Sequence, residues 1–191
     1  MDDQRARYPR VSDIIGVQTE SDMRQIPCEL LANASLRGTK VHELCSAYID
    51  NLFLGDVEPN LRPYIDAFIA WYDTHVKELV SNSTRLYDDV KRFTGEFDMI
   101  VRLLSGDLAL IDIKTSSSKT PSWPVQLAAY RHLCQINDHK VDIVLNLHLK
   151  KKDDDVEAKV ILYSADSLDK YWEIFQSALT CYDYFKRKGG I

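Results

Sequence analysis

The chain has 191 residues, of which 45% are hydrophobic and 28% are charged, and its formal net charge is −5. This length suits one domain around one core, and the composition excludes a disordered chain. The negative charge excludes a protein that coats nucleic acid by electrostatics alone, although it permits an enzyme whose acidic site holds cations.

Cysteine spacing and the N-terminus bear on the class of protein and its compartment. The four cysteines (Cys28, Cys45, Cys134 and Cys181) form no CxxC pair, which disfavours a zinc or iron–sulfur site and favours free thiols in a reducing cytoplasm. The N-terminus MDDQRARYPR lacks the apolar stretch of a signal peptide, and no run reaches the roughly 18 apolar residues of a membrane span. We expect a soluble protein without a membrane partner, in the cytoplasm or in the interior of a host cell if the source is viral. For a eukaryotic source, the nucleus and the mitochondrion stay open.

Two helices are predicted first along the chain. Thr39 can cap a helix that follows a glycine and carries apolar side chains at helical spacing. Residues 61–80 carry an apolar, largely aromatic stripe at the same spacing, which indicates a second helix packed on the core. The residues before the first helix mix polar and apolar positions irregularly. We therefore predict one domain over 1–191, with an N-terminal extension at 1–37 and a core at 38–191.

Strands dominate the next part of the chain. Segments with strand composition cover residues 84–90, 92–103 and 108–114, and the turn Ser105-Gly106-Asp107 makes the last two a hairpin. An amphipathic helix is predicted next, then two strands, then a long helix; their ranges are 123–136, 141–149, 156–163, and from a cap at Asp166 or Ser167 to about 188. This order of elements predicts an α/β fold with a sheet flanked by helices.

The end of the third predicted strand carries residues suited to phosphodiester hydrolysis. Side chains two apart on a strand share a face, so Asp112 and Lys114 point the same way. The carboxylate can bind a divalent cation, which stabilises charge on phosphoryl oxygens and lowers the pKa of an attacking water. The lysine can orient that water or offset developing negative charge. We expect that replacing either residue abolishes cleavage and leaves folding nearly intact.

Hairpin register adds Asp98 to this pair. A three-residue turn centred on Ser105 makes the numbers of facing residues sum to 210, which places Asp98 opposite Asp112; a two-residue turn would place it on the other face. Carboxylates on adjacent strands, about 5 Å apart at their Cβ atoms, can share a hard cation. The alternative is a surface ion pair between Asp112 and Lys114, with Asp98 solvated.

Four short motifs occur in the order of a known nuclease family. The helix GTKVHELC is similar to its G-x-x-x-H motif, the strand TGEFDMI to G-x-x-D, the strand IDIKTS to (D/E)-x-K, and the helix PVQLAAY to Q-x-x-x-Y. From about Gly38 to Leu133, half of the chain, the sequence resembles the RecB-type branch of the PD-(D/E)XK nuclease superfamily. The resemblance implies a restriction-endonuclease-like core, in which a central mixed β-sheet is flanked by helices.

The resemblance also implies roles for individual residues. The metal would be Mg²⁺ or Mn²⁺, and its ligands would be His42, Asp98, Asp112 and the carbonyl of Ile113. The catalytic residues would be Asp98, Asp112, Lys114, Gln126 and Tyr130. The last two lie four apart on one helix face, where an amide and a phenol can hydrogen-bond phosphate oxygens or hold the lysine. Trp123, one turn earlier, is better interpreted as a packed aromatic.

The sequence departs from the family pattern in one place that bears on the metal site. Many relatives carry a glutamate in the strand before G-x-x-D, where this chain has Asn82 or Ser83. Glu43 and Glu96 are poor substitutes, because Glu43 points in another helical direction and Glu96 lies on the opposite strand face. The relatives with an iron–sulfur cluster have three cysteines close together near the C-terminus, which this chain cannot supply.

These patterns predict a metal-dependent DNA nuclease. Within the family, the histidine-bearing branch implies an exonuclease in recombination, repair or phage DNA metabolism, with a homo-oligomer or a recombination or repair protein as a further partner. Because the net charge is negative, DNA must be held by a local basic surface, and Lys119 and Arg131 are the candidates beside the site. Two alternatives stay open: a non-catalytic nucleic-acid-binding module or partner subunit that retains the fold, and an unrelated α/β protein.

Overall fold

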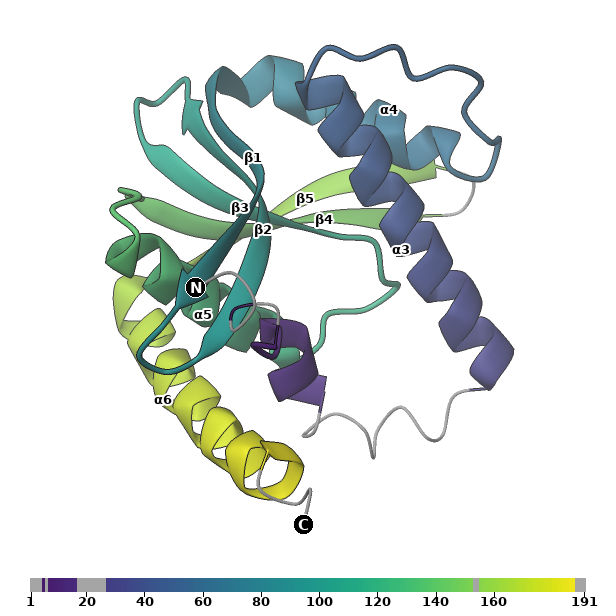
Figure 1. Cartoon of the computed structure of the whole chain (residues 1–191). Helices are drawn as coiled ribbons and strands as arrows, with labels where there is room; N and C mark the ends of the chain where they lie inside the picture. Colours follow the sequence, from purple (N-terminus) through teal and green to yellow (C-terminus); the bar gives the residue numbers. More distant parts are fainter. Residues whose placement is uncertain (1–4, 6, 17–26, 153–154, 188–191) are drawn as a thin grey trace.

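The computed structural model describes residues 5, 7–16, 27–152 and 155–187. One five-stranded sheet lies at the centre, with helices on both of its faces (Figure 1). The elements in chain order are α3 (Cys28–Ile49), α4 (Arg62–His75), β1 (Val76–Asp88), β2 (Phe93–Leu103), β3 (Leu108–Lys114), α5 (Ser122–Ile136), β4 (Ile143–Lys152), β5 (Asp155–Tyr163), α6 (Ala165–Tyr182) and the π-helical turn η1 (Asp183–Arg187).

The sheet is mixed, as predicted. Its strands are ordered β1-β2-β3-β4-β5, and every neighbouring pair is antiparallel except β3 and β4, which are parallel. A parallel pair cannot be joined by a tight turn, and α5 supplies the crossover between these two strands. The α/β fold with a central mixed sheet flanked by helices is therefore confirmed.

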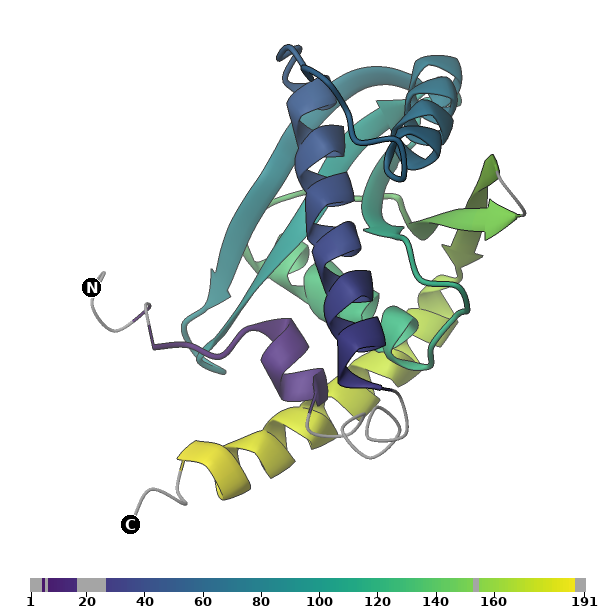
Figure 2. The same ribbon diagram turned by 90° about the vertical axis from the view of Figure 1, so that its right-hand side faces the viewer.

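Two hydrophobic cores lie on the two faces of the sheet. One contains the buried side chains of α5 and α6, and the other contains those of α3 and α4. The first core also takes in Val11 and Ile14 from a short helix at residues 11–16, which lies between the start of α3 and the tip of the β1–β2 hairpin (Figure 2). Part of the segment that we placed in an N-terminal extension thus packs in the core. The division of 1–191 into extension and core itself stays a prediction.

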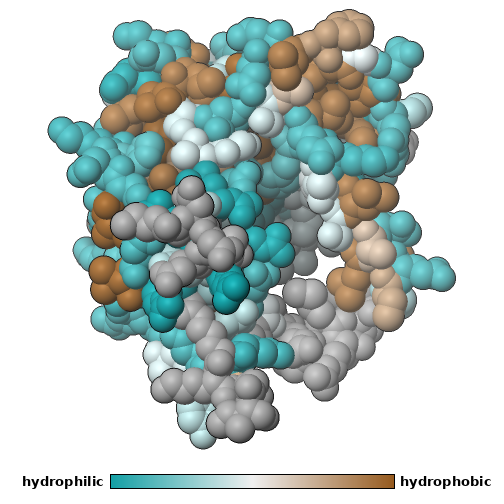
Figure 3. All heavy atoms as spheres, viewed as in Figure 1, coloured by the Kyte–Doolittle hydropathy of each residue, from teal (hydrophilic) through white to brown (hydrophobic). Residues whose placement is uncertain are grey.

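Helix α3 begins earlier than the sequence indicated. It starts at Cys28, so Thr39 lies inside the helix and the prediction that Thr39 caps it was wrong. The glycine before Thr39 does not interrupt the helix. A single glycine costs a helix only about 1 kcal/mol relative to alanine, less than burying the apolar residues that follow on α3 contributes. Hydrophobic side chains also gather on the outer surface over α3 and the loop after it (Figure 3), where Leu30, Leu36 and Phe53 are exposed.

The predicted helix at 61–80 is too long at its C-terminal end. Helix α4 ends at His75, and the chain continues as β1, where Leu79 pairs with Val101 of β2. Pairing with a distant strand is not visible in local periodicity, and here it overrides the helical spacing.

The last helix is capped by a residue other than those we expected. The side chain of Ser164 accepts a hydrogen bond from the backbone N–H of Ser167, so neither Asp166 nor Ser167 is the cap. The helix passes into η1 after Tyr182; its expected end near 188 lies outside the described residues. Within the described part of the chain, no helix is long and apolar enough to cross a membrane.

Candidate active site

The β2–β3 hairpin has the register that the sequence predicts. Met99 faces Ile111 and Ile100 faces Leu110, so the numbers of facing residues sum to 210. The turn is closed by Leu103, whose N–H donates to the carbonyl of Asp107 at 2.9 Å. The two strands pair as far as Met99 and Ile111, and Asp98 is the residue on β2 just before Met99.

Asp98 lies where the two strands part and connects three elements. Its Oδ2 accepts a hydrogen bond from the backbone N–H of Ile113 at 2.5 Å. If the pairing of β2 and β3 continued, a backbone carbonyl of β2 would accept this hydrogen bond instead. Its Oδ1 lies 2.7 Å from Nδ1 of His42 on α3. The N–H and C=O of one strand residue point to the same neighbouring strand, so the carbonyl of Ile113 also faces β2. His42, Asp98 and Ile113 are therefore brought together.

Charge pairing governs the titration of His42 and Asp98. Burial acts to lower the pKa of His42, but the charge of Asp98 and its hydrogen bond outweigh this and leave that pKa raised. Burial likewise acts to raise the pKa of Asp98, but His42, the N–H of Ile113 and the charge of Lys114 leave it lowered. The two groups therefore stabilise each other in their charged forms.

Asp112 and Lys114 begin a chain of side-chain contacts that leads to α5. Lys114 Nζ lies 2.8 Å from Asp112 Oδ2 and donates to Oε1 of Gln126 at 2.6 Å. Nε2 of Gln126 donates to the hydroxyl oxygen of Tyr130 at 2.8 Å. The side chains of Asp112 and Lys114 are only 5% and 17% exposed, so the interpretation as a surface ion pair was wrong. Burial raises the pKa of Asp112; Lys114 opposes that rise, and Asp98 adds to it.

The glycine of the TGEFDMI strand has a packing role. A Cβ atom on Gly95 would lie 2.8 Å from side-chain atoms of both Tyr130 and Leu133, so only glycine lets α5 approach β2 this closely. Burial raises the pKa of Tyr130 far above its usual range, so its hydroxyl keeps its proton. The close packing thereby positions the hydrogen-bonded pair of Gln126 and Tyr130 over the end of β3.

Sequence reasoning missed two residues behind Asp112. Asn146 of β4 is fully buried, lies beside Asp112 in the parallel register, and donates from Nδ2 to Asp112 Oδ2 at 2.7 Å. The hydroxyl of Tyr163 donates to Oδ1 of Asn146 at 2.9 Å. The sequence contained one signal for Asn146, because it is a polar residue in the largely apolar strand segment IVLNLHL. A buried amide needs hydrogen-bond partners, so a polar contact at this position could have been predicted.

The remaining residues singled out from the sequence lie around this centre. Trp123 is buried and packs edge-on against His148 at 4.9 Å between ring centroids, which confirms the packed-aromatic interpretation. Lys119 is exposed in the loop between β3 and α5. Arg131 lies on α5, and its Nη1 contacts Oδ1 of Asp169 on α6 at 2.8 Å. The structure thus does not bring Arg131 into contact with Lys114 or Asp112, and its role in DNA binding stays a prediction.

The position of the missing glutamate holds a polar link between β1 and α3. Nδ2 of Asn82 donates to the carbonyl and the hydroxyl oxygen of Ser46 at 3.2 and 3.0 Å. Ser83 adopts a left-handed φ of 40° and lines the cleft described next. Glu96 is paired with Arg85 and also lines that cleft; the expectation that it does not replace the glutamate as a ligand stays a prediction.

Two adjoining hollows open on the site. A cleft of about 650 Å³ is lined by His42 and Asp98 together with residues of α3, β1 and β2. A smaller pocket of about 200 Å³ is lined by Gln126 and Tyr130. Arg10 lines both, so the N-terminal segment forms a wall that they share.

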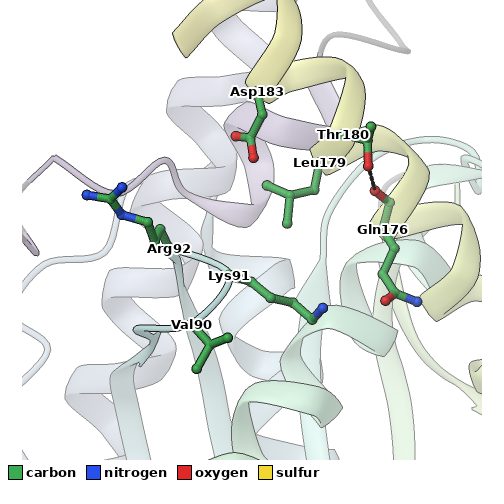
Figure 4. Close-up of a pocket in the computed structure, with 7 residues that line it drawn as sticks. All are labelled: Val90, Lys91, Arg92, Gln176, Leu179, Thr180 and Asp183. Carbon is green, nitrogen blue, oxygen red and sulfur yellow. Dashed lines mark hydrogen bonds between the residues drawn. The ribbon is translucent and has the colours of Figure 1, made fainter. Parts of the chain in front are cut away.

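A separate pocket lies at the tip of the β1–β2 hairpin, against the C-terminal half of α6 (Figure 4). Its volume is about 510 Å³, and its lining residues are Val90, Lys91, Arg92, Gln176, Leu179, Thr180 and Asp183. The dashed line in Figure 4 marks the hydrogen bond from the hydroxyl of Thr180 to the carbonyl of Gln176, which is internal to the helix. This pocket contains none of the residues that the sequence singled out.

The donors at the site suit a hard divalent cation in their chemistry. Two carboxylates and a main-chain carbonyl are oxygen ligands that suit Mg²⁺ and Mn²⁺, whereas an imidazole is a ligand more typical of transition metals. Within the described residues, no three His, Cys, Asp or Glu side chains are already arranged to hold a metal ion. Both oxygens of Asp98 are engaged, by His42 and by the N–H of Ile113. Each of these oxygens accepts one hydrogen bond and keeps a second lone pair that a cation could use. For Nδ1 of His42 to become a ligand as well, its contact with Asp98 would have to open.

Comparison with known proteins bears on the fold. No protein-family model and no curated protein matches the sequence. Among solved structures, a protein from Eubacterium rectale described as a candidate exonuclease matches 98% of this chain and 85% of its own, with a TM-score of 0.64 and 12% identity. The two chains share a fold. The structure of SSO0001 also matches, over 90% of this chain and 75% of its own, but its TM-score of 0.43 at 16% identity is too low to carry an argument.

Proposed function

We propose that this protein is a metal-dependent DNA nuclease of the RecB-type branch of the PD-(D/E)XK superfamily, and specifically an exonuclease of recombination, repair or phage DNA metabolism. The observation that carries the proposal is the buried pair of Asp112 and Lys114, which lies beside Asp98 and is tied to Gln126. Burying such charges is costly, and a carboxyl group whose pKa is raised by burial, as that of Asp112 is, is typical of active sites. The fold shared with a candidate exonuclease agrees with this proposal.

The residues that would hold the cation are Asp98, Asp112, the carbonyl of Ile113 and, after its contact with Asp98 opens, His42. When bound, Mg²⁺ or Mn²⁺ supplies positive charge to the phosphoryl oxygens and lowers the pKa of an attacking water. Both described contacts of the Asp112 carboxylate use Oδ2, which leaves Oδ1 as its oxygen for the cation.

Lys114 is placed to act on the reacting groups themselves. An ammonium has three N–H donors, and the described contacts of Lys114 to Asp112 and Gln126 account for two of them. The third can donate to the attacking water or to a phosphoryl oxygen, where negative charge develops. Because Gln126 fixes the ammonium beforehand, little reorganisation is needed during the reaction.

Tyr130 can contribute a second donor. Its oxygen accepts from Gln126, so its own proton is available for a phosphate oxygen in the smaller pocket that Tyr130 lines. Its raised pKa keeps this proton in place. We propose that Gln126 thus holds Lys114 and Tyr130 in one arrangement that faces the scissile phosphate.

DNA binding needs positive charge outside this centre. Lys119 is exposed in the loop that follows β3, and we propose that it contacts the DNA backbone. Arg131 is paired with Asp169, whose side chain is 71% exposed. Exposed pairs of this kind contribute little stability, so a phosphate can replace Asp169 as the partner of Arg131. A homo-oligomer or a recombination or repair partner stays a prediction.

Incubation with linear and circular duplex DNA in Mg²⁺ tests the proposed activity. An exonuclease degrades the linear DNA and leaves the covalently closed circle intact, and EDTA stops the reaction. Nicking or linearisation of the circle would instead indicate an endonuclease. Intact linear DNA under all divalent cations tried would contradict the proposed function.

A further inference from the structure

Asn146 is a buried polar residue in a strand that is otherwise largely apolar. It lies in the middle of β4, its exposed fraction is 0%, and its neighbours Leu145 and Leu147 are core residues on the opposite face of the sheet. A buried amide is costly unless its donors and acceptors are satisfied. Here Nδ2 donates to Asp112 Oδ2 at 2.7 Å and to the carbonyl of Asp112 at 3.3 Å.

Tyr163 determines which end of this amide faces Asp112. Its hydroxyl donates to Oδ1 of Asn146 at 2.9 Å, so the NH₂ end points to the carboxylate. A flipped amide would set its oxygen against Asp112 Oδ2, with two acceptors face to face and no proton between them. Burial raises the pKa of Tyr163 to about 12, so the hydroxyl remains a donor over the whole physiological range.

The effect of Asn146 on Asp112 differs from the effect of Lys114. Lys114 is a positive charge and offsets that of the carboxylate, whereas Asn146 is neutral and donates a hydrogen bond without cancelling the negative charge. Both donate to Oδ2, so the carboxylate is held by one oxygen and the other is directed away from the two donors. Groups that hydrogen-bond a metal-binding carboxylate in this way fix its orientation and tune its affinity for the metal.

We propose that Asn146 and Tyr163 are positioning residues that hold the carboxylate of Asp112 in the orientation that binds the divalent cation. This inference rests on the proposed function, since it assigns Asp112 as a ligand. Neither residue belongs to the four motifs of the chain, and Tyr163 lies at the end of β5, two strands away from Asp112 in the sheet.

Tyr163→Phe tests the pair with the smallest change, because it removes only the hydroxyl. The matched control is Tyr171→Phe: Tyr171 is also partly buried and packs edge-on against Tyr163, with 6.5 Å between ring centroids. The first readout is Mn²⁺ binding to the whole protein without DNA, followed by electron paramagnetic resonance. We expect about tenfold weaker binding for Tyr163→Phe, the lower end of what loss of such a partner costs, and wild-type binding for Tyr171→Phe.

Steady-state kinetics separate positioning from a general structural defect. Under subsaturating Mg²⁺, Tyr163→Phe should lower kcat with little change in the KM for DNA, and higher Mg²⁺ should restore much of the loss. Asn146→Leu removes the donor itself and should weaken Mn²⁺ binding at least as much. The double variant should bind Mn²⁺ no more weakly than Asn146→Leu does, because both changes interrupt the same chain of contacts.

The outcomes distinguish this inference from the proposed function. If the wild-type protein binds Mn²⁺ and cleaves DNA while Tyr163→Phe matches it in both, the positioning role is wrong and the nuclease proposal stands. If the wild-type protein neither binds Mn²⁺ nor cleaves DNA, the proposed function fails and this inference fails with it. Should Asn146→Leu not fold, the comparison of Tyr163→Phe with Tyr171→Phe decides alone.

Discussion

Lys114 occupies an unusual position for a lysine, since its ammonium lies between the buried carboxylate of Asp112 and the amide of Gln126. From the sequence we expected replacement of Lys114 to leave folding nearly intact. The structure changes that expectation, because Asp112 would be left buried without an opposite charge. Breaking such a pair from one side is destabilising.

Replacing Lys114 should therefore affect both stability and catalysis, and two variants separate them. Lys114→Ala should lower the free energy of unfolding by about 3 kcal/mol, the lower end for a broken buried pair, and reduce cleavage by about 10³-fold or more. Lys114→Arg keeps the charge but not the shape of the donor, so it should recover most of the stability and little of the activity. Urea unfolding and single-turnover cleavage measure the two effects. Full activity of Lys114→Arg would argue against a directional role for the ammonium.

Lys119 is the residue for which we predict a contact with the DNA backbone. Lys119→Ala should weaken DNA binding and reduce the slope of log K against log salt by about one phosphate contact. Turnover at saturating DNA should change far less, since the residue positions substrate without stabilising the transition state. Binding is measured by fluorescence anisotropy at several salt concentrations. If Lys151→Ala, an exposed position on β4, lowers the slope and Lys119→Ala does not, the contact lies on the outer lysine run instead.

Glycines in two elements near the site have different physical roles. Gly95 lies where α5 packs on β2, and a Cβ there would come within 2.8 Å of Tyr130 and Leu133. Gly38 lies inside α3, and a Cβ there would only reach ordinary contact, 3.5 Å from Oγ1 of Thr115. Both belong to the motifs that resemble those of the proposed family, yet only Gly95 is required by packing.

Gly95→Ala should destabilise the protein by about 1–3 kcal/mol, as expected for overpacking a tight contact. It should also lower activity, because Tyr130 and Gln126 move with α5. Gly16→Ala is the matched control, since nothing lies within 4 Å of a Cβ built there. Chemical denaturation of the two variants beside the wild type measures the difference. Equal stability of all three would mean that α5 can shift freely away from β2.

Gly38→Ala should stabilise the protein, in contrast to Gly95→Ala. In the interior of a helix, alanine is favoured over glycine by about 0.5–1 kcal/mol, and the added methyl group meets no obstacle closer than ordinary contact. We expect a higher midpoint of urea denaturation with cleavage unchanged. A loss of activity at unchanged or greater stability would show that this glycine serves the substrate and not the helix.

Local sequence patterns predicted the helices and strands better than the contacts between them. The Ser105 turn fixed the hairpin register and with it the neighbourhood of Asp98 and Asp112, because a turn and its flanking strands are encoded locally. The start of β1 was predicted as helix, since its pairing with β2 depends on a strand about 20 residues later in the chain. The hydrogen bond from the N–H of Ile113 to the carboxylate of Asp98 was likewise not foreseen, because it replaces a ladder bond at the point where β2 and β3 part.

The whole molecule assembles the candidate site from five elements. His42 comes from α3, Asp98 from β2, Asp112 and Lys114 from β3, Gln126 from α5, and Asn146 from β4. Motif order predicted the first four contributions. The fifth depends on the parallel pairing of β3 with β4, which sets Asn146 beside Asp112. Parallel strands pair at long range, so their register leaves no local signal in the sequence.

Cleavage by Asp112→Asn is the measurement that tests the central claim most directly. Asparagine keeps the shape of the side chain and can still accept from Lys114, but it removes the charge that would bind the cation. With linear DNA and Mg²⁺, we expect cleavage to fall by about 10³-fold or more while the far-UV spectrum is unchanged. Asp66→Asn on α4, at an exposed carboxylate paired with Arg62, should cleave like the wild type. Wild-type cleavage by Asp112→Asn would contradict the assignment of this site.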